Sequence, residues 1–368
     1  MPTKKQRVAV LFGGQSGEHE VSLISAQSVI AGLDSAKYVV VPVGITKDGH
    51  WIGGPDAHTA LIAAADQALL PGGEGQTLDA NAIRNLHTRR FPIFGARELV
   101  DVVFPVLHGP MGEDGTVQGV LELAGVPYVG CGVAASAVGM DKALMKAAFA
   151  AAGLPLLPWL LVRRFDLERD PAQVYAQIEA QLHYPVFVKP ANMGSSVGVG
   201  KAKDRAGLVE ALQNAARYDR RLVVEQGIAA REIEVSVLGN DEPKASVPGE
   251  VIPAGEWYDY AAKYLSGAST IVIPAEVAPD LVAQVQAMAI SAFLAINGAG
   301  LSRVDFLLDK ASGELWLNEV NTLPGFTSVS MYAKMWAASG LSYAQLLDQL
   351  IELAFARWNT TPRIAESA

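Results

Sequence analysis

The sequence has almost no cysteine and no long hydrophobic run. Cys131 is the only cysteine among 368 residues, so an intrachain disulfide is impossible, which fits a reducing cytoplasm. The longest apolar stretch, Leu281 to Ile296, is interrupted by two glutamines and is too short to cross a bilayer. The N-terminal residues run directly into a predicted strand without the apolar core of a signal peptide. We therefore expect a cytoplasmic protein that is not associated with a membrane.

The sequence also has fewer basic than acidic residues. The chain has 29 lysines and arginines against 38 aspartates and glutamates, which gives a net charge of −9. This balance argues against nonspecific binding of nucleic acid. Half of the residues are hydrophobic, and the length predicts two or three domains with substantial cores.

Several familiar motifs are missing. The glycine-rich stretch Lys189–Gly200 is not a Walker A loop, because Ser195 occupies the upstream glycine position and Lys201 is followed by alanine. The same stretch does not fit the dinucleotide-binding fingerprint. The His19–Glu20 pair lacks the second histidine of a zinc-binding helix, since leucine stands four residues after His19. These absences exclude three common site types.

Hydrophobic periodicity predicts alternating strands and helices along the whole chain. Strands are expected at residues 8–12, 38–43, 99–107, 159–162, 185–190, 221–225 and 232–238. Helices are expected at residues 21–32, 116–124, 141–152, 279–297 and 343–358. The alternation indicates βαβ units with a parallel sheet in the first part, and residues 57–76 are interpreted as a surface insertion. The prediction is three α/β pieces, 1–134, 135–226 and 227–368.

A β-hairpin near the C-terminus is the most informative segment. Two runs of alternating apolar and polar residues flank a turn at Ser312-Gly313. The period of two places Arg303 and Asp305 on one face of the first strand, and Glu319 and Asn321 on one face of the second. Antiparallel pairing would collect hard oxygen donors suited to Mg²⁺ beside a guanidinium suited to an oxyanion or phosphoryl group. The alternative is a salt-bridged edge hairpin with a structural role.

The glycine-rich stretch Lys189–Gly200 leaves a predicted strand. Glycines allow backbone amides to approach phosphate oxygens, serines add hydroxyl donors, and lysine supplies a compact positive charge. This composition is suited to a phosphate group. The alternative is an ordinary turn between two strands.

Polar residues also follow two predicted strands of the first part. Glu18 comes after the first strand, at the edge where ligands bind in open α/β sheets, although Ser16 or Ser22 could instead cap the following helix. His108 ends the third strand and is followed by Glu113-Asp114, acidic residues that could simply cap a helix. Both strand ends are candidate parts of a site.

The loop-rich stretch 255–269 contains the segment Tyr258–Tyr264, which combines aromatic residues with a lysine. Such a loop fits a lid that closes over a substrate and excludes water. The alternative is a partly packed surface loop.

Six segments, taken in order, resemble the D-alanine–D-alanine ligases, which are ATP-grasp enzymes. The matching segments are residues 13–22, 108–115, 189–198, 258–264, 303–306 and 318–325. The resemblance implies an α/β fold with three-domain ATP-grasp architecture, including an N-terminal parallel-sheet domain, and ATP held between the central and C-terminal domains. It further implies a cytoplasmic homodimer that makes D-alanyl-D-alanine through a D-alanyl phosphate, giving ADP and phosphate, for peptidoglycan precursor synthesis.

The resemblance also implies a role for individual residues. Two Mg²⁺ ions, with Mn²⁺ as a substitute, would be held by Asp305, Glu319 and Asn321. ATP would be contacted by Lys142, Lys189, Ser196, Glu225, Gln226, Ile228, Glu232 and Lys263. The D-alanine molecules would be bound by Glu18, His108, Ser330 and Met331. Catalysis would involve Glu18, Ser195, Tyr264, Arg303 and the Gly325 amide. Gln226 departs from the family, which often has a lysine there, and this puts the adenine contacts in question.

Three other functions remain open at this stage. The first is a ligase that joins D-alanine to D-lactate or D-serine; Tyr264 argues against D-lactate, because lactate ligases of this family often carry phenylalanine at that position. The second is another ATP-grasp ligase that joins a carboxylate to an amine, against which the segments 108–114 and 258–260 speak. The third is a nucleotide-binding regulatory protein with an inactive site, which the complete set of hairpin residues disfavours.

Overall fold

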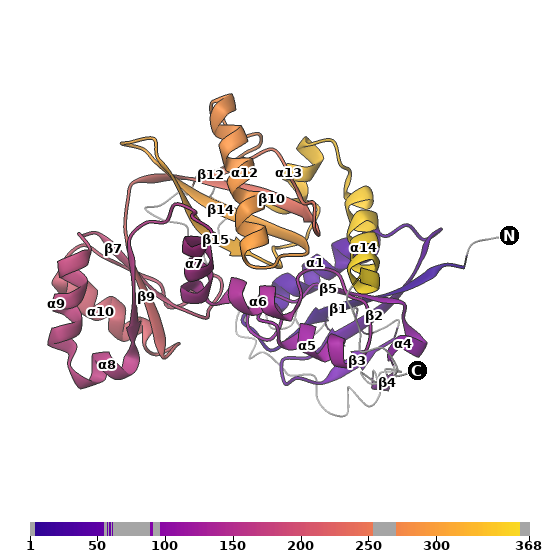
Figure 1. Cartoon of the computed structure of the whole chain (residues 1–368). Coiled ribbons are helices and arrows are strands. Elements are labelled where there is room, and N and C mark those ends of the chain that lie inside the picture. The colour runs from indigo at the N-terminus through magenta and orange to yellow at the C-terminus, as the bar shows by residue number, and fades with distance from the viewer. Residues whose placement is uncertain are drawn as a thin grey trace, which may run out of the picture.

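The chain folds around three β-sheets. A computed structural model describes residues 4–54, 57, 59, 61, 89–90, 96–252 and 270–360. The sheets have five, four and six strands in the order of the chain. Figure 1 shows the sheet with β7 and β9 at one end of the molecule, the sheet with β10 and β14 in the middle and the sheet with β1 and β2 at the other end. The α/β class predicted from the alternation of strands and helices is confirmed.

The five-stranded sheet is formed by the N-terminal part of the chain. Its order is β4-β3-β2-β1-β5, with β1 (Gln6–Gly13), β2 (Tyr38–Ile45), β3 (Trp51–Gly53), β4 (Arg89–Arg90) and β5 (Val102–Pro105). Strand β1 runs parallel to both β2 and β5, as the sequence predicts, because a helix connects β1 to β2. The antiparallel strands β3 and β4 were not predicted.

Alternate residues of β1 face opposite sides of this sheet. Val8 and Val10 pack with helix α1 (His19–Gly32), whereas Ala9 and Leu11 pack with helix α5 (Thr116–Leu123). Both sides are therefore buried, which explains why β1 reads as a continuous apolar run. Most of the predicted insertion 57–76 lies outside the described residues.

The four-stranded sheet has the order β6-β9-β7-β8 and is antiparallel. Its strands are β6 (Trp159–Arg163), β7 (Val186–Pro190), β8 (Gly200–Ala202) and β9 (Arg221–Gln226). The helices of this region are α6 (Val133–Met140), α7 (Lys142–Ala151), α8 (Arg164–Arg169), α9 (Pro171–Gln181) and α10 (Arg205–Ala215). The strand predictions and the helix at α7 are confirmed, whereas α6, α8, α9 and α10 were not predicted.

The six-stranded sheet has the order β13-β12-β10-β14-β15, and β11 pairs with β10. Its strands are β10 (Ala230–Gly239), β11 (Lys244–Ala245), β12 (Gly249–Ile252), β13 (Thr270–Val272), β14 (Gly300–Asp309) and β15 (Leu315–Asn321). Helices α12 (Pro279–Ala295) and α13 (Met331–Ala338) pack against it. The predicted hairpin is β14 and β15, which lie at one edge of this sheet: β14 pairs with β10, and β15 is the edge strand.

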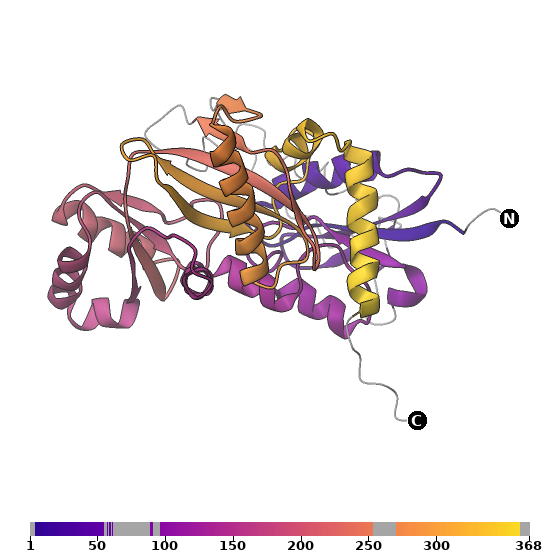
Figure 2. The same cartoon turned by 45° about the horizontal axis from the view of Figure 1, so that its top comes forward.

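The last helix returns to the first sheet. Helix α14 (Tyr343–Thr360) buries Leu346 and Leu350 in the same core as Val8, Phe104 and α1 (Figure 2). Its amphipathic pattern predicted the helix but not this partner. The division at residues 134 and 226 stays a prediction. Among the described helices, none is both long enough and apolar enough to span a membrane.

Candidate active site

A cavity of about 830 Å³ lies where the three sheets meet. Every site residue predicted from the sequence that the structure describes lines this cavity, although the residues come from all parts of the chain. They are Glu18, His108, Lys142, Lys189, Ser195, Ser196, Glu225, Gln226, Ile228, Glu232, Arg303, Asp305, Glu319, Asn321, Gly325, Ser330 and Met331. Lys263, Tyr264 and the predicted lid around them lie outside the described residues.

The hairpin brings its polar residues together in the predicted way. Arg303 pairs with Asn321 and Asp305 pairs with Glu319 across the two antiparallel strands. A β-bulge follows, because the next pair is Phe306 with Leu317, which leaves Asn318 without a cross-strand partner. The four polar side chains therefore project from the same face of the hairpin into the cavity.

Arg303 is held by two carboxylates. Its Nε and Nη2 donate to the two oxygens of Asp305 at 2.7 and 2.6 Å, and Nε lies 3.2 Å from Glu234 Oε2. Burial alone would lower the pKa of Arg303, but Asp305 and Glu234 raise it well above the ordinary arginine value. Glu234 was missed, although it lies two residues after Glu232 and so shares its face of β10.

The glycine-rich stretch is a turn between antiparallel strands β7 and β8 that also borders the cavity. The interpretation as a turn between strands is confirmed, whereas phosphate binding by this stretch stays a prediction. Ser195 and Ser196 have φ angles of 49° and 59°, in the left-handed region that residues other than glycine seldom adopt. Such strain is typical of functional loops whose surroundings hold the backbone in place.

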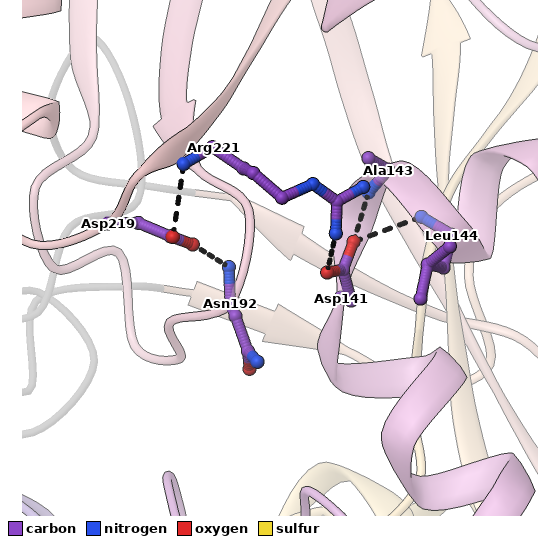
Figure 3. Close-up of polar contacts among 6 residues, drawn as sticks. All are labelled: Asp141, Ala143, Leu144, Asn192, Asp219 and Arg221. Carbon is purple, nitrogen blue, oxygen red and sulfur yellow. Dashed lines mark hydrogen bonds and ion pairs between the residues drawn. The ribbon is translucent and has the colours of Figure 1, made fainter. Parts of the chain in front are cut away.

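Side chains of two aspartates anchor this loop and the adjacent helix (Figure 3). Asp219 accepts hydrogen bonds from the backbone amides of Asn192 and Arg221, at 2.8 and 3.1 Å. Asp141 pairs with the guanidinium of Arg221 and caps α7 by accepting from the amides of its first residues. The start of the loop, the start of β9 and the start of α7 are thereby joined.

Helix α7 and strand β7 each place a lysine in the part of the cavity wall formed by the four-stranded sheet. The Nζ atom of Lys142 donates to the carbonyl of Met193 in the glycine-rich stretch, at 2.6 Å. The ammonium of Lys189, on β7, pairs with one carboxylate oxygen of Glu225, on β9. Burial lowers the pKa of Lys142. Burial also acts to lower the pKa of Lys189, but the carboxylates of Glu225, Glu319 and Glu232 together raise it.

The opposite wall of the cavity carries two carboxylates. A side-chain atom placed on Gly194 would lie 3.2 Å from Glu18 Oε1 and 3.4 Å from Glu113 Oε1, so the glycine-rich stretch passes close to both. Burial, with the nearby charge of Glu18, raises the pKa of Glu113 to about 8. Glu113 accepts from the amide of Gly109 at 3.0 Å and does not cap a helix. Nothing in the local sequence pattern indicates that this carboxylate is buried.

His108 is buried beside these carboxylates. Its Nδ1 lies 3.1 Å from the carbonyl oxygen of Leu323, which can only accept, so Nδ1 carries a hydrogen. Burial lowers the pKa of His108, although the charge of Glu18 opposes this. The residue is therefore a neutral imidazole that joins the first sheet to the chain after β15.

Ser16 and Ser22 do not cap α1, whose first turn has no side-chain cap. The hydroxyl of Ser16 donates to the carbonyl of His108 at 2.6 Å, and Ser22 donates to the carbonyl of Val106 while accepting from the amide of Gly13. The two serines instead connect the segments that follow β1 and β5. These hydrogen bonds hold the loop that carries Glu18 against the loop that carries His108.

Gln226 uses its side chain for structure. Its Nε2 donates to the carbonyl of His183 at 2.7 Å, and its Oε1 accepts from the His183 amide at 2.9 Å. The carboxamide thus closes the turn before β7, although Gln226 also borders the cavity. At the other end of the cavity, the hydroxyl of Ser330 accepts from the Thr327 amide at 3.0 Å and lies close to Gly325.

These groups divide the cavity chemically. Ammonium groups lie between α7 and the four-stranded sheet, oxygen ligands and a guanidinium lie on the hairpin, and carboxylates lie on the N-terminal side. Such a cavity suits a polyanion at one end and an amino acid at the other.

Models of one protein family match most of the chain. The model described as D-ala D-ala ligase N-terminus matches residues 7–131, and the one described as D-ala D-ala ligase C-terminus matches residues 148–352. A D-alanine--D-alanine ligase of Heliobacterium modesticaldum is 54% identical over 98% of this chain and 98% of its own length. One from Ruminiclostridium cellulolyticum is 50% identical, with the same shares covered.

Solved structures of D-Ala:D-Ser and D-alanine-D-alanine ligases also resemble this chain. The VanG D-Ala:D-Ser ligase from Enterococcus faecalis superimposes with a TM-score of 0.81, at 35% identity over 95% of this chain and all of that one. The D-alanine-D-alanine ligase from Coxiella burnetii gives a TM-score of 0.79, at 36% identity over 97% of this chain and 96% of that one.

Proposed function

The chain belongs to the D-alanine–D-alanine ligase family, and we propose that it joins two molecules of D-alanine while ATP is converted to ADP and phosphate. One observation carries this proposal: residues far apart in sequence, from Glu18 to Met331, border a single cavity with cationic, oxygen-donor and carboxylate regions. The product, D-alanyl-D-alanine, would serve peptidoglycan precursor synthesis.

The first step would activate the carboxylate of one D-alanine. Glu18 would bind its ammonium group, and His108 would border the same position as a neutral imidazole whose Nε2 can accept a hydrogen bond. Lys142 and Lys189 would bind the phosphates of ATP, with Ser195 and Ser196 on the glycine-rich turn covering them. The γ-phosphoryl group passes to a carboxylate oxygen of D-alanine and ADP leaves, which gives an acyl phosphate with a good leaving group.

The remaining nucleotide contacts would come from the end of β9, the start of β10 and the turn between them. Glu225, Gln226, Ile228 and Glu232 would address the adenine and ribose. The carboxamide of Gln226 is hydrogen-bonded to the backbone of His183, so Gln226 would contact adenine through its own backbone and not through its side chain. Lys263 would complete the contacts from the predicted lid.

The hairpin fits a magnesium site. Asp305, Glu319 and Asn321 supply hard oxygen donors on one face, and two Mg²⁺ ions, with Mn²⁺ as a substitute, would be held there. The ions would neutralise charge on the transferring phosphoryl group. Both carboxylate oxygens of Asp305 accept hydrogen bonds from Arg303. If Asp305 binds a metal ion, its oxygens would either accept these hydrogen bonds at the same time or lose them.

The second step would form the peptide bond. Ser330 and Met331 would receive the second D-alanine, whose amine attacks the acyl phosphate and displaces phosphate. Arg303 and the Gly325 amide would stabilise the oxyanion of the tetrahedral intermediate. Tyr264, acting with Ser195 and Glu18, would assist loss of the amine proton and close the lid, so that water does not hydrolyse the acyl phosphate.

The decisive experiment incubates the protein with ATP, Mg²⁺ and a D-amino acid, and measures phosphate and product together. D-Alanine should give D-alanyl-D-alanine with one phosphate per dipeptide, and L-alanine essentially none. D-Serine and D-lactate are tested as second substrates alongside D-alanine. Efficient use of D-serine in place of D-alanine would redirect the proposal to a D-Ala:D-Ser ligase, and ATP binding without any product would contradict it.

The proposal extends to the assembly and location of the protein. A homodimer is proposed from the resemblance, and sedimentation equilibrium tests it. A cytoplasmic location is likewise proposed from the resemblance, and fractionation of cells tests it. The division into domains at residues 134 and 226 is proposed on the same footing, and limited proteolysis tests it.

A further inference from the structure

Lys146 is a buried lysine without an assigned role. It lies one helical turn after Lys142 on α7, but it does not border the cavity. Lysine is almost never fully buried unless it is paired, yet Lys146 is only 2% exposed. Its Nζ lies 2.8 Å from Glu225 Oε2, and the other oxygen of Glu225 pairs with Lys189. One buried carboxylate thus lies between two ammonium groups.

The contact between Lys146 and Glu225 is electrostatic. Oε2 of Glu225 has no aligned hydrogen-bond donor among the described residues, although the ammonium is close. Burial would raise the pKa of Glu225, but Lys146 and Lys189 lower it to about 2. Glu225 therefore stays ionised, and the cluster carries one negative and two positive charges.

The position of Lys146 allows Lys189 to leave Glu225 without leaving the buried carboxylate unpaired. The proposed function requires its ammonium to bind the nucleotide, but in the structure that ammonium pairs with Glu225. If Lys189 were the only partner, its departure would leave a buried carboxylate uncompensated, which is strongly unfavourable. A second cation on the far side of Glu225 removes this penalty.

The position of Lys146 is fixed by the packing of α7. Ala143 packs with Ala191, just after β7, and with Val223 on β9, and the amide of Lys142 donates to the carbonyl of Ala191 at 2.8 Å. The pair between Asp141 and Arg221 joins the start of the helix to β9, the strand that carries Glu225. Lys146 therefore approaches Glu225 from behind the cavity wall and is not placed to contact phosphate.

We propose that Lys146 is a positioning residue that holds Glu225 and keeps its charge compensated, so that Lys189 is released to bind ATP. The inference rests on the proposed function, because it takes the nucleotide as the ligand of Lys189. Its effect should fall on nucleotide affinity and not on D-alanine binding.

The test is a double-mutant cycle on Lys146→Met and Glu225→Gln. Affinity for a nonhydrolysable ATP analogue with Mg²⁺ is measured by calorimetry without D-alanine, and both Michaelis constants are measured in turnover. Lys146→Met should weaken nucleotide binding by about tenfold or more and leave the D-alanine constant within about twofold. In the Glu225→Gln background the same change should cost less than about threefold, because no carboxylate remains to compensate.

Two further variants complete the design. Lys146→Arg keeps the charge and should retain nucleotide affinity within about threefold, which also decides the matter if Lys146→Met does not fold. Lys244→Met removes an exposed lysine of β11 outside the cavity and controls for the change in net charge. Thermal unfolding reports whether each variant is folded.

Three outcomes would overturn the inference. The first is unchanged nucleotide affinity in folded Lys146→Met, which would leave a purely structural role. The second is an equal loss with and without the Glu225 carboxylate. The third is a tenfold loss in folded Lys146→Arg. If the wild type binds the analogue but makes no dipeptide, the ligase proposal fails, while the cycle still decides the role of Lys146.

Discussion

Glu113 should make the stability of this protein depend on pH. Its carboxyl group is buried beside the cavity, and burial together with the charge of Glu18 raises its pKa to about 8 from an ordinary 4.5. Between these two values the folded protein binds a proton that the unfolded chain has lost. Stability therefore falls as the pH rises through this range, and the loss ends once the folded group has ionised. We predict that Glu113→Gln removes this dependence.

The size of the effect follows from the pKa difference. Each pH unit between the unfolded and folded pKa values costs about 1.4 kcal/mol, so from about pH 5.5 to about pH 7.5 the wild type should lose roughly 3 kcal/mol relative to the variant. Glutamine keeps an oxygen that can accept from the amide of Gly109. The substitution therefore removes the titration and preserves the hydrogen bond.

The assay is urea unfolding of both proteins across this pH range. The difference between their free energies of unfolding cancels the titration of all other groups that the two proteins share. Glu210→Gln, an exposed glutamate of α10, is the control and should run parallel to the wild type at every pH. If the Glu113→Gln curve also runs parallel to the wild type, then the Glu113 pKa is not raised and the reasoning from its burial is wrong.

Four other substitutions test the site. Glu319→Ala should lower turnover by orders of magnitude in a folded protein, because metal and oxyanion contacts contribute several kcal/mol each, and near-normal activity at saturating Mg²⁺ would refute the metal assignment. Glu18→Gln should raise the Michaelis constant of D-alanine far more than that of ATP, and the reverse pattern would place Glu18 outside the substrate site. Tyr264→Phe should keep phosphoryl transfer and shift the second substrate toward hydroxy acids; the absence of depsipeptide from D-lactate at low pH would count against the lid. Arg221→Met should weaken ATP binding about three- to tenfold by loosening the start of α7, and an unchanged ATP constant would show that the pair with Asp141 does not position the site.

The sequence was most informative where function and local pattern coincide. The alternation in β14 and β15 placed Arg303, Asp305, Glu319 and Asn321 on one face, and the observed register pairs them as predicted. Period-2 geometry is a property of the backbone, so it needs no knowledge of the rest of the fold. The bulge at Asn318 was not visible in the sequence, because it depends on how two strands are matched.

Burial could not be predicted in the same way. Glu113 stood in the sequence as a possible helix cap, and Lys146, a second lysine of the helix predicted at residues 141–152, was given no role. Their pKa values and partners depend on which surfaces cover them, and those surfaces come from other parts of the chain. The position of Glu234 could have been predicted, because a residue two positions after Glu232 on the same strand lies on the same face.

The sequence by itself determined the types and order of most strands, the hairpin, the phosphate-suited turn and the chemistry of the candidate residues, since each depends on neighbours within a few positions. Only the tertiary structure decided that Glu18, Lys189 and Arg303 border one cavity, and that α14 packs on the first sheet. Those outcomes depend on the packing of apolar faces that are similar to one another, and a single amphipathic pattern does not specify which face it will cover.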